Sequence, residues 1–156
     1  MSSARARANH HLYLAKIVQD GWRAARAARG GVPGQTLAQA YLPVVSEHLV
    51  RAYGWFLLEV TGAEQMPGAP PRGCDALPPV PAGKALPGEI REFQHLETRG
   101  WLADMLAERD LTPGASRTPG NLATAPADIP DPEQVADWTA RLEALFTRMR
   151  ESLDEY

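Results

Sequence analysis

The sequence predicts an all-α protein, a four-helix bundle that forms a single domain over residues 1–156. Long segments carry apolar residues at three- and four-residue steps, no segment shows the alternation of a strand, and segments rich in glycine and proline separate the helical ones. With 44% hydrophobic and 22% charged residues, a chain of this length buries roughly two-thirds of its unfolded surface. The predicted helices are about 4–29, 35–63, 89–110 and 132–155, and the long connections are 66–88 and 111–130.

The first predicted helix, residues 4–29, has a broad apolar stripe that Leu14 and Ile17 widen further. Charged side chains such as Arg5 and Asp20 lie on the opposite face, so one side of the helix is expected to be buried. Gly30 and Gly31 end the pattern. The stripe consists of Ala8, Leu12, Ala15, Val18, Trp22 and Ala25.

The second predicted helix, residues 35–63, is apolar on most sides in its C-terminal half, which we expect to be the most buried segment. Pro43 lies inside it, and a proline in a helix interior costs about 3 kcal/mol. The sequence therefore predicts either a kink at Pro43 or a helix start near it, and Gly62 ends the helix. One face carries Leu37, Tyr41, Val44, Val45, Ala52, Trp55 and Phe56.

The segment 66–88 contains seven prolines in twenty-three residues, which excludes a helix or a central strand. Its length predicts an extended crossover that travels the full length of a bundle. In the third helical region, residues 89–110, the apolar phase shifts near Gly100, so two short helices meeting there are an alternative to one. Residues 111–130 form the second irregular connection.

The last predicted helix, residues 132–155, has the clearest start, with Asp131 as N-cap, Pro132 at the first position and Gln134 at the third. Its apolar stripe follows a heptad spacing. We favour a core role for this stripe within the monomer, and a homodimer seam is the alternative. The stripe consists of Val135, Trp138, Leu142, Leu145, Met149 and Tyr156.

The charge is distributed unevenly although the net charge is only -3. Residues 1–30 carry six bases against one acid, and residues 131–156 carry seven acids against three arginines. One interpretation is a basic arm that binds nucleic acid. We favour the other, in which the first and last helices lie side by side and attract each other, because the acidic balance of the whole chain weakens phosphate binding.

Four ionisable residues fall on faces that should be buried: His11, His48, Glu59 and Glu97. Buried charges are costly unless they are paired, so each needs a partner. Helical bundles also build metal sites from such residues. The di-iron pattern needs two ExxH helices, however, and only Glu92–His95 has that spacing. We therefore predict that the four are either ordinary polar groups with satisfied partners or a structural polar cluster joined by hydrogen bonds, with no metal ligands, no cofactor and no catalytic residue.

The chain has one cysteine, Cys74, which excludes an intrachain disulfide and favours a reducing compartment. The basic N-terminus has no apolar segment behind it, as a secretory signal would, and no apolar run reaches the ~20 residues of a membrane span. We predict a cytoplasmic protein. Arg72 could lower the pKa of the Cys74 thiol, but no histidine is near it in sequence to act as a base.

Two segments carry a resemblance. Arg7-Ala8-Asn9-His10-His11-Leu12-Tyr13-Leu14-Ala15 and Leu96-Glu97-Thr98-Arg99-Gly100-Trp101-Leu102 together resemble a small uncharacterised family of proteobacterial proteins, classed as a domain of unknown function. The resemblance covers the first helix and the third helical region. It implies a bacterial cytosolic protein and supplies no activity.

We predict a non-catalytic module that binds another protein or itself, because a good core coincides with an absence of site chemistry. A metal-binding bundle enzyme would depend on the four buried His and Glu residues. Nucleic-acid binding would depend on the basic first helix.

Overall fold

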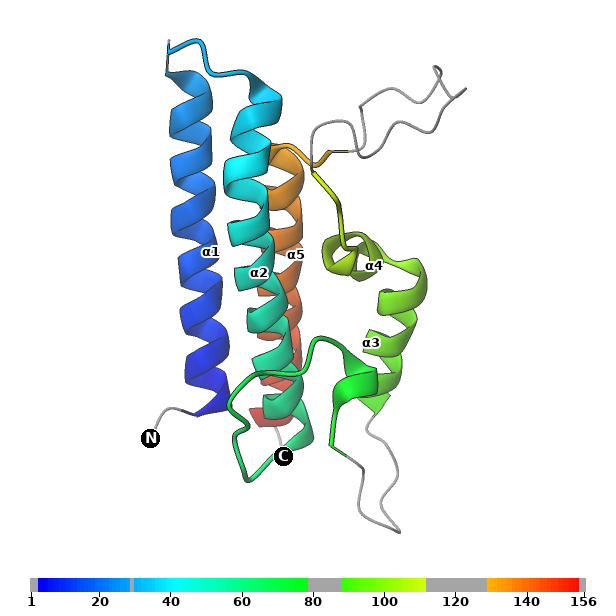
Figure 1. Cartoon of the computed structure of the whole chain (residues 1–156). Helices are drawn as coiled ribbons and strands as arrows, with labels where there is room; N and C mark the ends of the chain where they lie inside the picture. The colour runs from blue at the N-terminus through cyan, green and yellow to red at the C-terminus, as the bar shows by residue number, and fades with distance from the viewer. Residues whose placement is uncertain (1–2, 29, 79–87, 112–128, 155–156) are drawn as a thin grey trace.

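The computed structural model describes residues 3–28, 30–78, 88–111 and 129–154, and these are helical with no strand. Three long helices lie side by side, and two short ones pack on one side of them (Figure 1). The predicted all-α class is confirmed. None of the described helices has the length and apolar character needed to cross a membrane. The elements are α1 (Ala4–Ala27), α2 (Gly34–Thr61), the 3-10 turn η1 (Cys74–Ala76), α3 (Gly88–Arg99), α4 (Trp101–Leu106) and α5 (Pro132–Asp154).

The predicted helix boundaries hold where a specific residue sets them. Gly62 adopts a left-handed conformation with φ 67°, which glycine reaches without steric cost. The following amide, of Ala63, donates to the carbonyl of Leu58 at 3.1 Å and closes α2 with a Schellman motif. At the start of α5, the Asp131 carboxylate accepts from the amide of Gln134 at 2.8 Å, as the predicted N-cap requires.

Pro43 does not interrupt α2, which runs without a break from Gly34 to Thr61. The predicted alternative of a helix start near Pro43 is therefore wrong. The proline ring is on the exposed side of the helix, while Leu42, Val45 and Leu49 are buried on the other side. Burial of such side chains stabilises by about 1.5–3 kcal/mol each, which outweighs the amide hydrogen bond lost at the proline.

The third helical region is two helices that meet at Gly100, as the phase shift suggested. The prediction that helix continues to residue 110 is wrong, because α4 ends at Leu106. The guanidinium of Arg109 donates to the backbone carbonyls of Asp104, at 2.9 Å, and Ala107, at 3.2 Å. These carbonyls at the end of α4 are thus satisfied without another helical turn.

The connection between α2 and α3 begins and ends at the same end of the long helices (Figure 1). The predicted full-length crossover is therefore wrong. Its described part contains one 3-10 turn, η1, and returns along α2, where Pro71 lies directly on Gly54. A Cβ on Gly54 would meet the carbonyl oxygen of Pro71 at 2.1 Å, so only glycine fits there. Residues 79–87 and 112–128, which belong to the two predicted connections, lie outside the described part.

The core lies among the long helices and α3. Phe56 of α2 stacks on Phe146 of α5 with ring centroids 4.1 Å apart, and Phe93 of α3 meets Phe56 edge-on at 5.8 Å. The predicted stripe of α5 is buried from Val135 to Met149, and Thr139 and Phe146 are buried with it. The stripe is thus as wide as a core helix requires, which supports the core role; Tyr156 lies outside the described residues.

Candidate functional site

The four polar residues singled out from the sequence do not form one cluster. They occupy three separate places in the fold, for a geometric reason. His48 and Glu59 lie on one helix, but they are eleven residues apart, which is about 16 Å along the axis. Glu97 lies on α3 instead. Of the two alternatives from the sequence, the four side chains fit ordinary polar groups with satisfied partners rather than one cluster.

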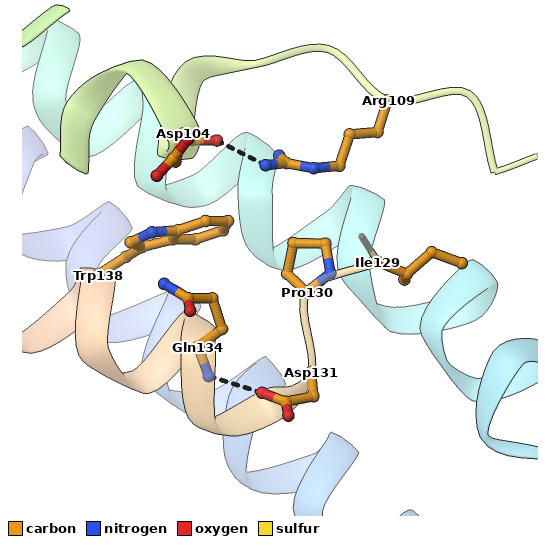
Figure 2. A pocket seen from close by; sticks show the side chains of 7 residues that line it. All are labelled: Asp104, Arg109, Ile129, Pro130, Asp131, Gln134 and Trp138. Atoms are coloured by element: carbon orange, nitrogen blue, oxygen red, sulfur yellow. Dashed lines mark hydrogen bonds between the residues drawn. The ribbon is translucent and has the colours of Figure 1, made fainter. Parts of the chain in front are cut away.

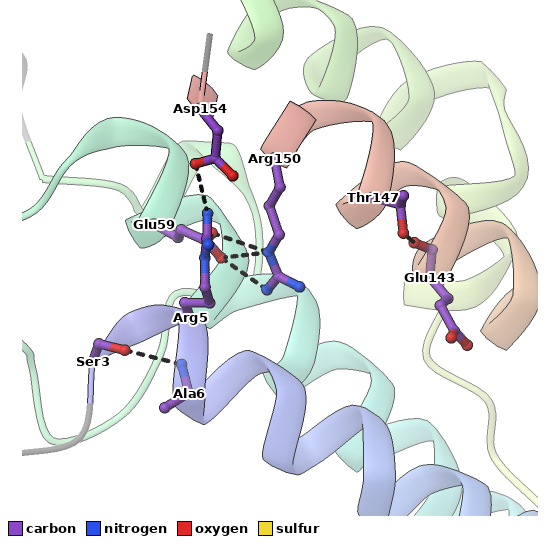
Figure 3. Close-up of polar contacts among 8 residues, drawn as sticks. All are labelled: Ser3, Arg5, Ala6, Glu59, Glu143, Thr147, Arg150 and Asp154. Carbon is purple, nitrogen blue, oxygen red and sulfur yellow. Dashed lines mark hydrogen bonds and ion pairs between the residues drawn. The ribbon is translucent and has the colours of Figure 1, made fainter. Parts of the chain in front are cut away.

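Glu59 lies at the end of the bundle where α1 begins and α5 ends (Figure 3). Its side chain is 9% exposed and accepts from Arg150 at 2.9 Å and from Arg5 at 2.7 Å. Arg5 also pairs with Asp154 at 3.4 Å, and the Arg150 guanidinium lies over the ring of Phe146 at 5.1 Å. The neutralised carboxylate of Glu59 thus links α1, α2 and α5. Because it is bound by two guanidinium groups, it is not available for chemistry.

Glu97 is held by a different kind of contact. It accepts a hydrogen bond from the Tyr53 hydroxyl at 2.7 Å and from the backbone amide of Cys74 at 3.1 Å. The network joins α2, α3 and the turn η1. These hydrogen bonds hold the segment that follows α2 against α2 and α3.

The Cys74 thiol is not activated. Burial and the hydrogen bond to Glu97 raise its pKa to about 12. The expectation that Arg72 lowers this pKa is wrong, because Arg72 donates to Glu47 at 2.9 Å instead. Burial, followed by the hydrogen bond to Glu97, also raises the pKa of Tyr53. A thiol that stays protonated at neutral pH is a poor nucleophile.

His11 of α1 and His48 of α2 face each other. Their Nδ1 atoms are 3.3 Å apart and their ring centroids 5.5 Å apart. Both rings are half-buried. Burial is the main cause that lowers the pKa of both imidazoles. The next cause for His11 is the neighbouring His48, and the next cause for His48 is the positive charge of Arg51. Both rings are therefore neutral at neutral pH. The exposed ring of His10 lies 5.9 Å from that of His11.

The described residues contain no group of three or more His, Cys, Asp or Glu side chains placed to hold a metal. Of the predicted ExxH pair, Glu92 accepts from Arg148 at 2.6 Å and His95 is exposed on α3. Glu92 and His95 therefore do not form part of a metal site of the kind that the ExxH spacing suggests.

A pocket of about 420 Å³ lies between α4 and the start of α5 (Figure 2). Its floor is Trp138, which is buried and whose indole nitrogen has no hydrogen-bond partner in the described part of the chain. Arg109 lies over this ring at 5.3 Å, and burial lowers its pKa. Sequence reasoning missed Arg109 because it assigned the residue to a helix. The pocket holds Asp104, Asp131 and Gln134 as well, but no nucleophile with an adjacent base.

Within the described chain, the large hydrophobic side chains that are exposed are Tyr13, Ile17, Val32 and Val44, and these belong to α1, α2 or the turn that joins them. Ile17 and Val44 were expected to be buried, and they are 49% and 46% exposed. We call Tyr13, Ile17 and Val44 the outer face.

Ile17 of α1 and Val44 of α2 lie at about the same level of the helix pair. In this antiparallel pair His11 meets His48, and Trp22 stacks on Tyr41. The register between these two contacts places Ile17 and Val44 at a similar level along the helix axes. Tyr13 is one turn from Ile17 along α1, on the same side of the helix. Tyr13, Ile17 and Val44 are thus exposed within one stretch of the α1–α2 pair.

The basic residues of α1 meet the acidic residues of α5. Lys16 pairs with Glu143 and Arg26 with Glu133, so the side-by-side interpretation of the charge pattern is confirmed. Arg7 instead lies over the ring of Trp55 at 4.6 Å. Because these basic side chains of α1 have partners within the fold, fewer of them are available to bind phosphate groups than the sequence suggested.

Comparison with known proteins returned no match of any of three kinds: no protein-family model, no curated protein and no solved structure.

Proposed function

We propose that this chain is a non-catalytic association module that binds another protein, or a second copy of itself, through the outer face of α1 and α2. The observation that carries this proposal is the exposure of Tyr13, Ile17 and Val44 within one stretch of the α1–α2 pair, while the opposite side of α1 packs in the core. Exposed apolar side chains that gather in one place are typical of protein-binding surfaces.

The chemistry elsewhere in the molecule agrees with a role in binding. The carboxylates of Glu59 and Glu97 are occupied by structural partners, and the Cys74 thiol is kept protonated. The outer face also carries charges of both signs, because Glu47 and Arg51 form an ion pair on α2 at 3.0 Å. A surface that combines exposed apolar side chains with charged ones resembles the anatomy of protein interfaces.

We also propose a finer architecture and a cellular location for the chain. If α3 and α4 are counted together as one helical unit, the chain is a four-helix bundle in which this unit is broken at Gly100. A buried, reduced Cys74 supports a cytoplasmic location. The resemblance to a proteobacterial family of unknown function supports a bacterial source, and association is a role that needs no cofactor.

The test compares two variants. Ile17→Asp with Val44→Asp places charge on the outer face, and Val32→Asp changes an equally exposed valine in the turn. Light scattering over a range of concentrations measures self-association, and a photo-crosslinker at position 13 captures a heterologous partner. We expect association of the wild type and of Val32→Asp, and loss in the double variant. If neither assay distinguishes the double variant from the wild type, the outer face is not a binding surface.

A further inference from the structure

Beyond association, the histidine pair has the geometry of a metal site. A tetrahedral zinc ion binds imidazole nitrogens at about 2.0–2.1 Å, so two such nitrogens on one ion lie about 3.3 Å apart. His11 Nδ1 and His48 Nδ1 are 3.3 Å apart. The two rings are held on separate long helices that are packed against each other by their buried faces, so the spacing is set before any ion arrives.

We propose that His11 and His48 bind one divalent transition-metal ion, of the zinc, nickel or copper class, through their Nδ1 atoms. Imidazole is the ligand type that these ions share. Two protein ligands leave coordination positions for water, and His10 lies next along the chain with its exposed ring 5.9 Å from that of His11. Structural zinc sites have four protein ligands and catalytic ones three. An ion that is held by only two protein ligands therefore exchanges readily with solvent.

The surroundings of the pair set the balance of charge at the site. Arg51, one turn after Glu47 on α2, is the nearby cation that opposes a bound metal ion. Its guanidinium donates to the Glu47 carboxylate at 3.0 Å, which offsets that charge, and Arg72 binds the same carboxylate. Glu47 is therefore committed to two arginines and is not a ligand. The metal-binding atoms are the two imidazole nitrogens, with His10 as the side chain able to add a third.

The chain contains four histidines, which supplies a matched control. Zinc is titrated into metal-free full-length protein by calorimetry, for the wild type and for His11→Gln, His48→Gln and His95→Gln. We expect one saturable equivalent for the wild type and for His95→Gln, and about tenfold or more weaker binding for each of the other two variants. Circular dichroism confirms that each variant is folded.

Nitrogen-15 NMR of the wild-type histidine rings gives a readout that needs no variant. Zinc should shift the Nδ1 resonances of His11 and His48 and leave those of His95 unchanged. The site is refuted if binding is absent, if it persists unchanged in His11→Gln and His48→Gln, or if His95→Gln removes it. The outer-face variant Ile17→Asp with Val44→Asp should still bind zinc, so failure of the association proposal and failure of the metal site are distinguishable.

Discussion

The long helices and the short ones are attached to the fold in different ways. α1, α2 and α5 meet mainly through apolar side chains, with exposed ion pairs at the edges and the ion pairs of Glu59 at one end. α3 and α4 are attached by polar contacts in addition to the buried Phe93 of α3. Glu97 accepts a hydrogen bond from Tyr53, and Arg109 caps the end of α4. Apolar contacts tolerate small shifts, whereas these polar contacts need one geometry. The two regions should therefore respond differently to mutation.

The largest effect is expected in the long-helix region, at Leu142. The side chain is fully buried, so Leu142→Ala should lower the free energy of unfolding by about 2–5 kcal/mol. Urea denaturation followed by circular dichroism measures this. As a companion, Leu145→Asp should unfold the chain, because Leu145 is also buried. A folded, monomeric Leu145→Asp protein from a dimeric parent would instead identify the α5 stripe as a dimer seam.

The next effect tests the contact between α2 and the connection that follows it. Gly54→Ala places a methyl group against the backbone of Pro71, which cannot move without displacing the connection. Overpacking of this kind costs about 1–3 kcal/mol. Gly68→Ala is the control in the same connection, because a Cβ there meets nothing within 4 Å. Equal unfolding free energies for the two variants, measured in urea, would mean that the Pro71 contact is loose.

The third effect concerns the network around Glu97 at alkaline pH. The pKa of Cys74 is raised from 9.0 to about 12 in the folded protein. The stabilisation from a protonated thiol is thus complete below pH 9 and is lost as the pH rises from 9 to 12, since the unfolded chain releases its proton first. Between pH 8 and pH 10 this amounts to about 1 kcal/mol.

Denaturation of wild type and Cys74→Ala, in the presence of a reductant, measures this effect. The wild type should lose about 1 kcal/mol more than the variant between the two pH values. The difference removes the contributions of the other titrating groups, including Tyr53. If both proteins lose the same amount of stability, Cys74 titrates normally and is not held in the Glu97 network.

The contrast between the two regions also explains which features could be predicted from the sequence. The helices of the long region follow a three- and four-residue apolar repeat, and specific residues such as Gly62 and Asp131 mark their ends. The end of α4 depends on Arg109, which reaches back from beyond the helix, and no local pattern announces that. Val44 was placed on a buried face because apolar periodicity alone cannot tell a core side from an exposed apolar strip.

The polar residues show the same limit. Burial correctly predicted that His11, His48, Glu59 and Glu97 have partners, since unpaired buried charge is too costly. Which partner each one has depends on the register between helices distant in sequence. His11 meets His48 rather than Glu59 because the α1–α2 pairing brings position 11 to position 48. That register is a property of the packed structure, and a single sequence contains no direct signal for it.

The smallest effect is expected at the ion pairs on the edge of the long-helix region. Lys16 of α1 pairs with Glu143 of α5, and both side chains are about half exposed. Exposed pairs of this kind contribute about 0–1 kcal/mol because water and salt screen them. Lys16→Ala should therefore change the free energy of unfolding by less than Leu142→Ala does, and the change should shrink further in high salt. The double-mutant cycle of Lys16→Ala with Glu143→Ala isolates the pair energy. A coupling as large as the effect of Leu142→Ala, or one that salt leaves unchanged, would show that charge and not apolar packing holds α1 against α5.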